Sequence, residues 1–256
     1  MGCQSKMALA WVTGAGTGIG RAVSLELARR GWIVAASSRT ESRLGSLAEE
    51  AAKLGGSVIP MALDVTLRDS VDVLVHHIEN EIGPIDLAVL NAGTYVQFGA
   101  SEFSVEAFQD QFDLNVMGTV NCANPVLKFM RDRESGHIAV VSSLTAYRGI
   151  PFASAYGATK AALTNMCEAL KPELEQFGVD ISVIHPGFVK TPLTDQNEFP
   201  MPFLMEANDA ARRIVDGLER RKFEVTFPRR FAFLLKLARC LPYSLYFAIT
   251  RRLVKQ

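Results

Sequence analysis

The sequence contains little that would mark a disulfide-rich, metal-binding or membrane-spanning protein. Its four cysteines are scattered, and no two of them form a C-x-x-C pair: Cys3, Cys122, Cys167 and Cys240. This pattern favours a reducing, cytoplasmic compartment and argues against a disulfide framework or a zinc site. No carboxylate cluster accompanies His137 or His185, so no metal site is predicted. Charged residues and a proline interrupt the apolar stretch 229–256, which excludes a transmembrane helix there.

The chain also lacks an excess of charge, with 27 basic and 27 acidic residues among 256. This balance carries no signature of nucleic-acid binding. The charge is unevenly distributed, because residues 212–256 hold twelve Lys and Arg against three Asp and Glu, a net charge of +9. No Pro-, Ser- or Gly-rich linker divides the chain, which favours one large α/β domain. Residues 1–7 lack the apolar core of a signal peptide and have Lys6 where an acylation signal requires Ser or Thr, so we expect a disordered leader.

What the sequence does have, near its beginning, is a glycine-rich turn between a strand and a helix. An apolar run at 8–12 leads directly into the turn, and apolar residues at helical spacing follow it. Glycines let the backbone approach a pyrophosphate, and the free N–H groups of the helix N-terminus favour the anion. The alternative is a tight corner without a ligand. The candidate cofactor-binding residues of this turn are Gly14, Gly16, Thr17, Gly18, Ile19 and Gly20.

Three further strands end in polar or small residues. The strand at 32–37 is followed by Ser38 and Arg39, where NAD sites usually carry a carboxylate, and a guanidinium there suits the 2′-phosphate of NADP. Arg39 could instead be a solvated residue that opens the next helix. Strand 57–63 ends in Asp64 and Val65, and Asp64 is either an adenine contact or the cap of a turn. The strand at 86–90 is followed by the small-residue corner Asn91, Ala92 and Gly93.

A long helical segment at about 105–131 is predicted next, with a kink at Pro125. Phe108, Phe112, Val116 and Val120 are expected to form its inner face, with Asn115 beside them. A buried Asn in the middle of a helix needs hydrogen-bond partners. The partner of Asn115 is either a purely structural contact or a water molecule next to Lys160.

The strongest chemical signal is the pair Tyr156 and Lys160, four residues apart on one face of a helix predicted at about 153–177. An ammonium close to a phenol favours the phenolate, so we expect Lys160 to lower the pKa of Tyr156 and make it a general acid or base. The strand at 137–141 ends in Ser142 and Ser143, whose hydroxyl groups could bind a substrate oxygen beside the phenol. Such Tyr and Lys pairs are also common on ordinary helix surfaces.

The rest of the chain continues the alternation of strands and helices. A strand at 179–185 leads to Pro186 and Gly187, and the apolar, proline-rich segment up to residue 205 suits a lid. A helix at about 207–221 and a strand at 223–227 complete the core. This order predicts an α/β fold: a doubly wound, Rossmann-like parallel seven-stranded sheet with helices on both faces over residues 8–228. Ligands of such sheets bind at the carboxyl ends of the strands. The candidates at these ends are Gly14–Gly20, Arg39, Asp64, Asn91, Ser143 and Pro186.

With these motifs in order and spacing, residues 8–228 resemble the short-chain dehydrogenase/reductase family. The resemblance implies a catalytic tetrad of Asn115, Ser143, Tyr156 and Lys160, in which Tyr156 protonates a carbonyl. It implies that Lys160 also holds the nicotinamide ribose and that the strand end Pro186, Gly187, Val189 and Thr191 contacts the cofactor. Two residues depart from the family pattern: Leu90 replaces a usual Asn, and Thr17 replaces the basic residue of many NADP-preferring members. NADP preference over NAD therefore rests on Arg39 alone.

The leading hypothesis is an NADP-dependent oxidoreductase acting on a hydrophobic carbonyl or alcohol. The alternatives are a non-catalytic dinucleotide-binding sensor or scaffold, and a protein that docks on membrane surfaces through its tail. The family resemblance also implies a homodimer or homotetramer, with exposed parts such as Phe129, Met166 and Leu170 at the interface. The expected pocket wall is apolar and aromatic: Thr94, Tyr95, Phe98, Leu144, Tyr147, Phe152, Phe188, Phe199 and Phe203.

The tail at 229–256 is predicted to form an amphipathic helical extension. Pro242 separates two helices, and the first carries Phe231, Leu234, Leu235 and Ala238 on one face, with basic residues opposite. These helices either cover the substrate cleft, pack against a second subunit, or anchor the protein peripherally to an anionic membrane.

Overall fold

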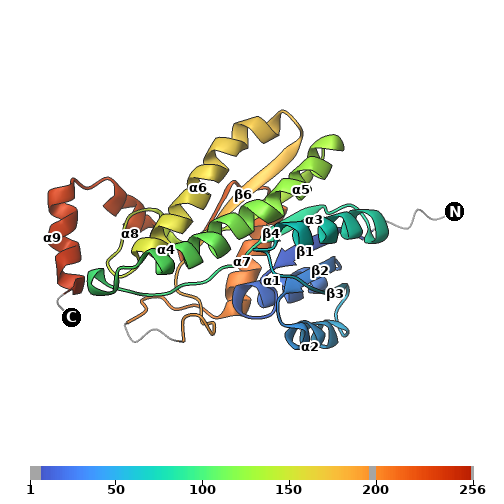
Figure 1. The fold of residues 1–256 in the computed structure, drawn as a ribbon, viewed down its shortest axis with the longest axis horizontal. Helices are drawn as coiled ribbons and strands as arrows, with labels where there is room; N and C mark the ends of the chain where they lie inside the picture. Colours follow the sequence, from blue (N-terminus) through green and yellow to red (C-terminus); the bar gives the residue numbers. More distant parts are fainter. Residues whose placement is uncertain (1–6, 196–199, 255–256) are drawn as a thin grey trace.

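The computed structural model describes residues 7–195 and 200–254, and its centre is a seven-stranded parallel sheet (Figure 1). The predicted leader lies almost wholly outside the described residues. Every pair of neighbouring strands is parallel, in the order β3-β2-β1-β4-β5-β6-β7. The strands are β1 (Leu9–Thr13), β2 (Ile33–Ser38), β3 (Ser57–Ala62), β4 (Leu87–Leu90), β5 (Gly136–Val141), β6 (Val179–Pro186) and β7 (Glu224–Phe227). The predicted doubly wound α/β fold is confirmed.

Helices cover both faces of the sheet. One face packs on α1 (Gly18–Arg29), α2 (Glu41–Ala51) and α7 (Ala207–Glu219). The other packs on α3 (Arg68–His77), α5 (Gly118–Asp132) and α6 (Ser154–Glu175), with α4 (Val105–Phe112) preceding α5. Each face of the sheet has its own hydrophobic core. Because side chains alternate across a strand, neighbouring residues such as Trp11 and Val12 of β1 pack into different cores. The most apolar strands are therefore buried on both sides.

The long helical segment differs from its prediction. A π-helical turn at Asp113–Met117 joins α4 to α5, and α5 continues as a helix through Pro125. The first half of the segment buries Gln111, Asn115 and Thr119, whereas the expected inner face is only half-buried. That prediction was wrong because the buried face carries polar residues around the π-helical turn, and it turns apolar only further on, at Cys122, Val126 and Met130.

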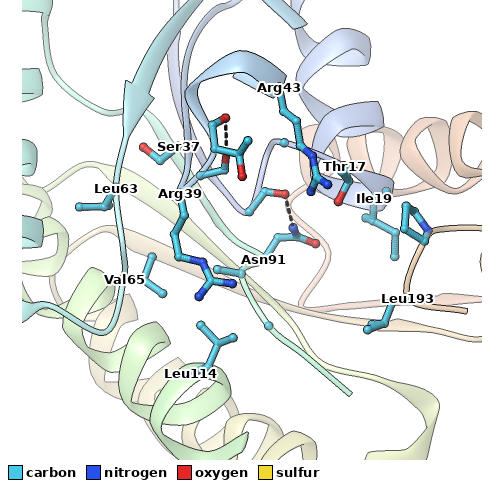
Figure 2. A pocket seen from close by; sticks show the side chains of 18 of the residues that line it. Thr17, Ile19, Ser37, Arg39, Arg43, Leu63, Val65, Asn91, Leu114 and Leu193 are labelled. Carbon is cyan, nitrogen blue, oxygen red and sulfur yellow. Dashed lines mark hydrogen bonds between the residues drawn. The ribbon is translucent and has the colours of Figure 1, made fainter. Parts of the chain in front are cut away.

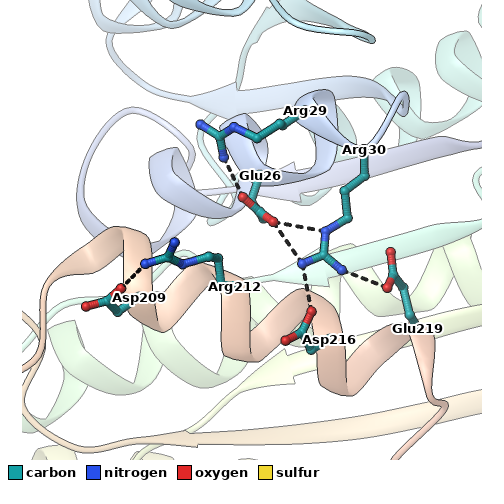
Figure 3. A network of polar contacts seen from close by, with 7 residues as sticks. All are labelled: Glu26, Arg29, Arg30, Asp209, Arg212, Asp216 and Glu219. Carbon is teal, nitrogen blue, oxygen red and sulfur yellow. Dashed lines mark hydrogen bonds and ion pairs between the residues drawn. The ribbon is translucent and has the colours of Figure 1, made fainter.

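Helices α1 and α7, distant in sequence, are joined at their ends by an ion-pair network (Figure 3). Arg30 at the end of α1 contacts Glu26 at 2.8 Å, and Asp216 and Glu219 of α7 at 2.7 Å each. Arg29 also pairs with Glu26. Because Glu26 is largely buried and shared by two guanidinium groups, the network fixes α7 against the C-terminal end of α1.

Two further helices follow the sheet at one end of the molecule, α8 (Arg229–Arg239) and α9 (Tyr243–Val254) (Figure 1). Ala232 of α8 packs with Leu144 and Tyr147, and Phe231 and Leu235 join this small cluster. Within residues 7–195 and 200–254, no helix is both long enough and apolar enough to cross a membrane. The described cysteines Cys122, Cys167 and Cys240 are all free.

Candidate active site

The glycine-rich turn between β1 and α1 is held in shape by Asn91. Gly14 and Gly18 have φ angles of +65° and +55°, which favour glycine. The Asn91 side chain donates hydrogen bonds to the carbonyl oxygens of Thr13 (3.1 Å) and Gly14 (3.3 Å). A Cβ atom on Gly20 would lie 2.4 Å from the Gly14 carbonyl oxygen. Asn91 and Gly20 are thus needed for the shape of the turn itself.

The turn borders a cavity of about 530 Å³, which we call the glycine cavity (Figure 2). It lies where the strand order reverses between β1 and β4, at the carboxyl ends of the strands. Most of the predicted cofactor residues line it: Gly14, Gly16, Thr17, Gly18, Ile19, Ser38, Arg39, Asp64, Val65, Asn91, Ala92, Gly93 and Thr191.

The glycine cavity fits an extended anionic nucleotide. Thr17, which precedes α1, makes no side-chain bond to the first turn, so the N–H groups at this helix end are available to an anion. A Cβ on Gly16 would lie 2.9 Å from Ser38 Oγ, and one on Gly18 would lie 3.0 Å from Thr191 Cγ2. Any side chain at position 16 or 18 would therefore press against Ser38 or Thr191 at the border of the cavity, so glycine suits both positions.

Two arginines enter the glycine cavity, and the sequence prediction found only one of them. Figure 2 shows the guanidinium of Arg39 between Val65 and Leu114, and that of Arg43 beside Thr17. Arg43 lies in the first turn of α2, whereas Arg39 lies in the loop before this helix, so no sequence spacing pointed to their common cavity. Arg39 is thus not alone in bringing positive charge to the glycine cavity.

Asp64 caps a turn, which is one of the two roles predicted for it. Its carboxylate accepts hydrogen bonds from the backbone N–H (3.0 Å) and the hydroxyl (2.8 Å) of Thr66. Burial alone would raise the pKa of Asp64, but these bonds and the charge of Arg39 outweigh it and lower the pKa. Asp64 therefore stays ionised while it lines the cavity, and an adenine contact remains a prediction.

A second cavity of about 110 Å³, the middle cavity, continues from the glycine cavity and shares Ile19, Asn91, Gly93 and Thr191 with it. It contains the other predicted cofactor residues and most of the predicted tetrad: Ser143, Tyr156, Lys160, Pro186, Gly187 and Val189. Lys160 is almost fully buried, and its Nζ donates a 2.9 Å hydrogen bond to the carbonyl oxygen of Val141 at the end of β5. The end of the sheet therefore positions the ammonium.

The phenol and the ammonium have pKa values shifted by burial. Burial raises the pKa of Tyr156 to about 12, although a hydrogen bond with Ser143 acts in the opposite direction. Burial also lowers the pKa of Lys160 to about 8. The net pKa of Tyr156 is therefore raised and not lowered as expected, because desolvation disfavours the phenolate more than nearby groups stabilise it. Near neutral pH the phenol holds its proton.

Asn115 is fully buried in the π-helical turn and holds the chain after β4. Its Oδ1 accepts a 2.7 Å hydrogen bond from the Thr94 N–H, and its Nδ2 donates to the Thr94 carbonyl (3.0 Å) and Thr159 Oγ1 (3.1 Å). The Asn115 carbonyl accepts from Thr119 Oγ1 at 2.7 Å. The structural contact is therefore present, and a water molecule held next to Lys160 remains a prediction.

A third cavity of about 150 Å³, the apolar cavity, lies on the other side of the phenol. Its lining combines Ser143, Tyr156 and Thr194 with apolar side chains: Tyr95, Leu144, Ile150, Ala153, Phe188, Leu193, Phe231 and Leu235. Of the expected wall, Tyr95, Leu144 and Phe188 are confirmed, and Thr94 lines the middle cavity instead. Phe98, Phe152 and Phe203 do not line the apolar cavity, and Phe199 lies outside the described residues.

Tyr147 was also expected in this wall, but it points away from the cavity. Its hydroxyl donates to Glu224 at 2.6 Å, and its ring centre lies 4.8 Å from that of His185. Lys236 of α8 pairs with the same carboxylate. This polar cluster attaches α8 to β7, so that Phe231 and Leu235 close the apolar cavity. Phe231 and Leu235 were not predicted to line the cavity, because the sequence does not show which part of the protein the tail packs against.

No group of three or more His, Cys, Asp or Glu among the described residues could hold a metal ion. The site instead consists of a glycine-rich turn, a half-buried phenol with an ammonium beside it, and an apolar cavity, along adjoining cavities that share lining residues. A family model described as short chain dehydrogenase matches residues 8–200. The chain belongs to this short-chain dehydrogenase family. It is therefore an oxidoreductase by family, with a nicotinamide dinucleotide as the cofactor type of its structural neighbours.

Similar proteins agree with this assignment. An uncharacterized oxidoreductase of Myxococcus xanthus (strain DK1622) is 41% identical over 244 residues, which cover 95% of this short-chain dehydrogenase and 96% of the relative. The alcohol dehydrogenase of the archaeon Thermococcus sibiricus, complexed with 5-hydroxy-NADP, is 26% identical with a TM-score of 0.78, covering 87% of this chain and 96% of its own. A Burkholderia phymatum short-chain dehydrogenase/reductase in complex with NAD shares the fold, with a TM-score of 0.83 at 23% identity over 93% and 94% of the two chains.

Proposed function

We propose that this short-chain dehydrogenase is an NADP-dependent carbonyl reductase or alcohol dehydrogenase in which Tyr156 is the general acid and base. One observation carries the proposal: Tyr156 and Ser143 line both the middle cavity and the apolar cavity. A cofactor on the glycine side and a carbonyl compound on the apolar side would therefore meet at the phenol. The cofactor, when bound, supplies or accepts the hydride, and the chain supplies the proton and the orientation.

In the reducing direction, the Tyr156 phenol would give its proton to the substrate's carbonyl oxygen, with the hydride supplied by the bound cofactor, and an alcohol would form. The raised pKa of Tyr156 keeps the proton available near neutral pH. Ser143 Oγ accepts a 3.2 Å hydrogen bond from the Thr145 N–H and is also hydrogen-bonded to Tyr156, so its hydroxyl lies beside the phenol, where it can polarise the carbonyl. The Lys160 ammonium favours the phenolate that remains after proton transfer.

The preference for NADP over NAD is supported by the two arginines of the glycine cavity. Arg39 and Arg43 flank Ser38 at the end of β2, where no carboxylate is available to bind ribose hydroxyls. Guanidinium groups bind phosphate through paired charge-assisted hydrogen bonds. The complex of the Thermococcus sibiricus neighbour with an NADP derivative agrees with this preference, whereas the NAD complex of the Burkholderia phymatum neighbour does not.

The direct test measures NADPH and NADH oxidation by the purified protein with a panel of carbonyl compounds of increasing apolar size. We expect turnover that favours NADPH and the more apolar ketones and aldehydes, because the apolar cavity offers them the larger buried contact. A non-catalytic dinucleotide sensor would bind NADPH without oxidising it against any compound of the panel. The phenol, which a binding module does not need, argues against that alternative.

A homodimer or homotetramer is part of the same proposal. Phe112, Val116 and Val120 are only half-buried in the single chain, and Met117 between them is exposed. An apolar flank of this kind on α4 and α5 suits a second copy of the chain. Light scattering at micromolar concentration would reveal the assembly, and a monomer throughout would contradict it.

A further inference from the structure

Helix α8 has two apolar faces, only one of which is covered. Phe231, Ala232 and Leu235 face the body of the protein. Phe233, Leu234 and Leu237 lie on the other side, and their exposed fractions are 67%, 54% and 56%. The predicted face is therefore corrected, because Ala232 is buried where Leu234 was expected. The inner face closes the apolar cavity, and the outer face has no use within the single chain.

The uncovered apolar surface continues along α9. Tyr246 and Thr250 are buried and fix this helix, and the Tyr246 hydroxyl donates a 2.6 Å hydrogen bond to the Gly149 carbonyl. Arg148 reinforces the attachment by donating a 2.7 Å hydrogen bond to the Leu241 carbonyl between the two helices. The remaining apolar side chains of α9 are exposed: Tyr243, Leu245, Phe247, Ile249, Leu253 and Val254. We call the exposed apolar side chains of α8 and α9 together the outer apolar face.

The segment that carries this face holds charged residues of one sign only, although Lys236 pairs with Glu224 of β7. Residues 229–256 contain seven Lys and Arg and no Asp or Glu. Arg230 and Arg251 are exposed on the two helices that carry the outer apolar face. Exposed apolar side chains with basic residues around them suit insertion at an anionic lipid surface. The helices have only 11 and 12 residues, so they can lie on a bilayer but are too short to span it.

A separate exposed apolar patch borders the substrate cleft. Phe231 lines the apolar cavity, and its ring centre lies 5.9 Å from that of Phe203 in the segment before α7. Phe203 is half exposed, and its neighbour Leu204 is exposed as well. An apolar path therefore runs from the exposed surface, over Phe203 and Phe231, to the cavity that the Tyr156 phenol borders.

We propose that α8 and α9 dock on the surface of an anionic bilayer through the outer apolar face, and that the substrate is a carbonyl or alcohol dissolved in that bilayer. The second part rests on the proposed oxidoreductase function, and the first does not. A second copy of the chain suits the face less well. Two copies meeting symmetrically through it would bring the exposed arginines of both helices, among them Arg230 and Arg251, toward the same residues of the second copy, which opposes association.

The docking is tested by sedimenting the full-length protein with vesicles of phosphatidylcholine alone, or of equal parts phosphatidylcholine and phosphatidylglycerol, at low and high salt. We expect binding to the anionic vesicles that weakens with salt. Replacing Arg251 and Arg252 with Gln should weaken the binding roughly five-fold for each charge removed. The variant Leu234→Ser with Leu237→Ser should weaken it at least about ten-fold through lost apolar contact.

Matched controls lie far from this face, on α3 and in the turn that follows α2 (Figure 1). Val73→Ser changes an equally exposed apolar residue of α3, and Lys53→Gln changes an exposed cation, and both should bind vesicles like the parent. NADPH affinity and thermal unfolding show that each variant is folded. Absence of binding to anionic vesicles at low salt overturns the docking, and so does equal binding by the tail variants and the controls. If the leucine variant instead dissociates an oligomer that binds no vesicles, the partner is a second copy and the proposal is overturned.

The proposed substrate class is tested by a separate measurement of KM, whose failure can be told apart from failure of the docking or of the enzymatic function. With a long-chain ketone dissolved in the anionic vesicles, the tail variants should show a higher KM at unchanged kcat. With a short, water-soluble ketone, parent and variants should have the same KM. Turnover of the water-soluble ketone together with equal KM values for the vesicle-bound one would overturn the substrate class and leave the oxidoreductase function intact. Inactivity toward both ketones despite vesicle binding would contradict the oxidoreductase function and, with it, the substrate class, but not the docking.

Discussion

The Lys160 Nζ lies 5.6 Å from the centre of the Tyr156 ring, and it is held there by a hydrogen bond to the Val141 carbonyl. The two side chains come from consecutive turns of α6, whereas Val141 ends β5. The sheet therefore sets the position of the ammonium, and the helix sets that of the phenol relative to it. Burial acts on both groups by disfavouring their charged forms.

The burial of Lys160 predicts a pH dependence of stability. Its pKa falls from the ordinary 10.5 to about 8, so the unfolded chain binds the proton more tightly than the folded one. Unfolding free energy therefore rises, through this group, as pH increases from about 8 to 10. Below pH 8 the buried charge destabilises the fold by up to about 3 kcal/mol relative to a neutral side chain.

Lys160→Met isolates this effect, because Cys and Tyr residues that titrate in the same range are common to both proteins. Urea unfolding of the cofactor-free parent and variant from pH 7 to 10 should show the parent gaining stability relative to the variant. A difference in unfolding free energy that does not change with pH would show that the Lys160 pKa is not lowered.

Removal of the Asn115 side-chain amide is expected to destabilise the fold. Asn115→Ala removes three side-chain hydrogen bonds from a fully buried position and leaves the Thr94 N–H and carbonyl without their partner. We expect a cost of roughly 1–3 kcal/mol in unfolding free energy. NADPH affinity should fall as well, since Gly93 and Thr94 border the middle cavity. Asn124→Ala, at an exposed position of α5, is the matched control and should change neither quantity. Equal stability of the two variants would refute the structural role of Asn115.

The two arginines of the glycine cavity predict cofactor selectivity. Arg39→Ala and Arg43→Ala should each weaken NADPH binding by about ten- to a hundredfold and change NADH binding little, because only NADPH carries the 2′-phosphate. Ser38→Asp combined with Arg39→Leu should reverse the preference. Fluorescence titration measures both cofactors, with Arg68→Ala on α3 as the control for lost surface charge. Parent affinities that are equal for NADPH and NADH would argue against any role in selectivity.

The strand ends were predictable because every strand of the sheet is parallel. The carboxyl ends then share one edge, which placed Arg39, Asn91 and Ser143 together without knowledge of any contact. The spacing of Tyr156 and Lys160 was sufficient to put both in one cavity. The parallel strand order and the helical spacing of Tyr156 and Lys160 each fix where residues lie in space, so these parts of the fold and of the candidate site could be predicted from the sequence.

Other features depended on contacts between distant segments. The direction of the Tyr156 pKa shift depends on how deeply the phenol is buried, which helical spacing does not reveal. The Tyr147 hydroxyl donates a hydrogen bond to Glu224 of β7, which lies 77 residues later in the chain. Such a distant partner cannot be read from the sequence around Tyr147. The covered face of α8 was misjudged for the same reason, since its apolar residues surround the helix and only the partner surface decides which of them are buried.

The central claim is that the Tyr156 phenol transfers the proton, and Tyr156→Phe tests it most directly. The variant should keep the parent's thermal unfolding and NADPH affinity while kcat for carbonyl reduction falls by roughly 10²–10⁴-fold. Tyr95→Phe removes a hydroxyl from the neighbouring ring, whose centre lies 4.9 Å away in the same apolar cavity, and should retain most of the activity. A folded, NADPH-binding Tyr156→Phe variant with near-parental kcat would contradict the account.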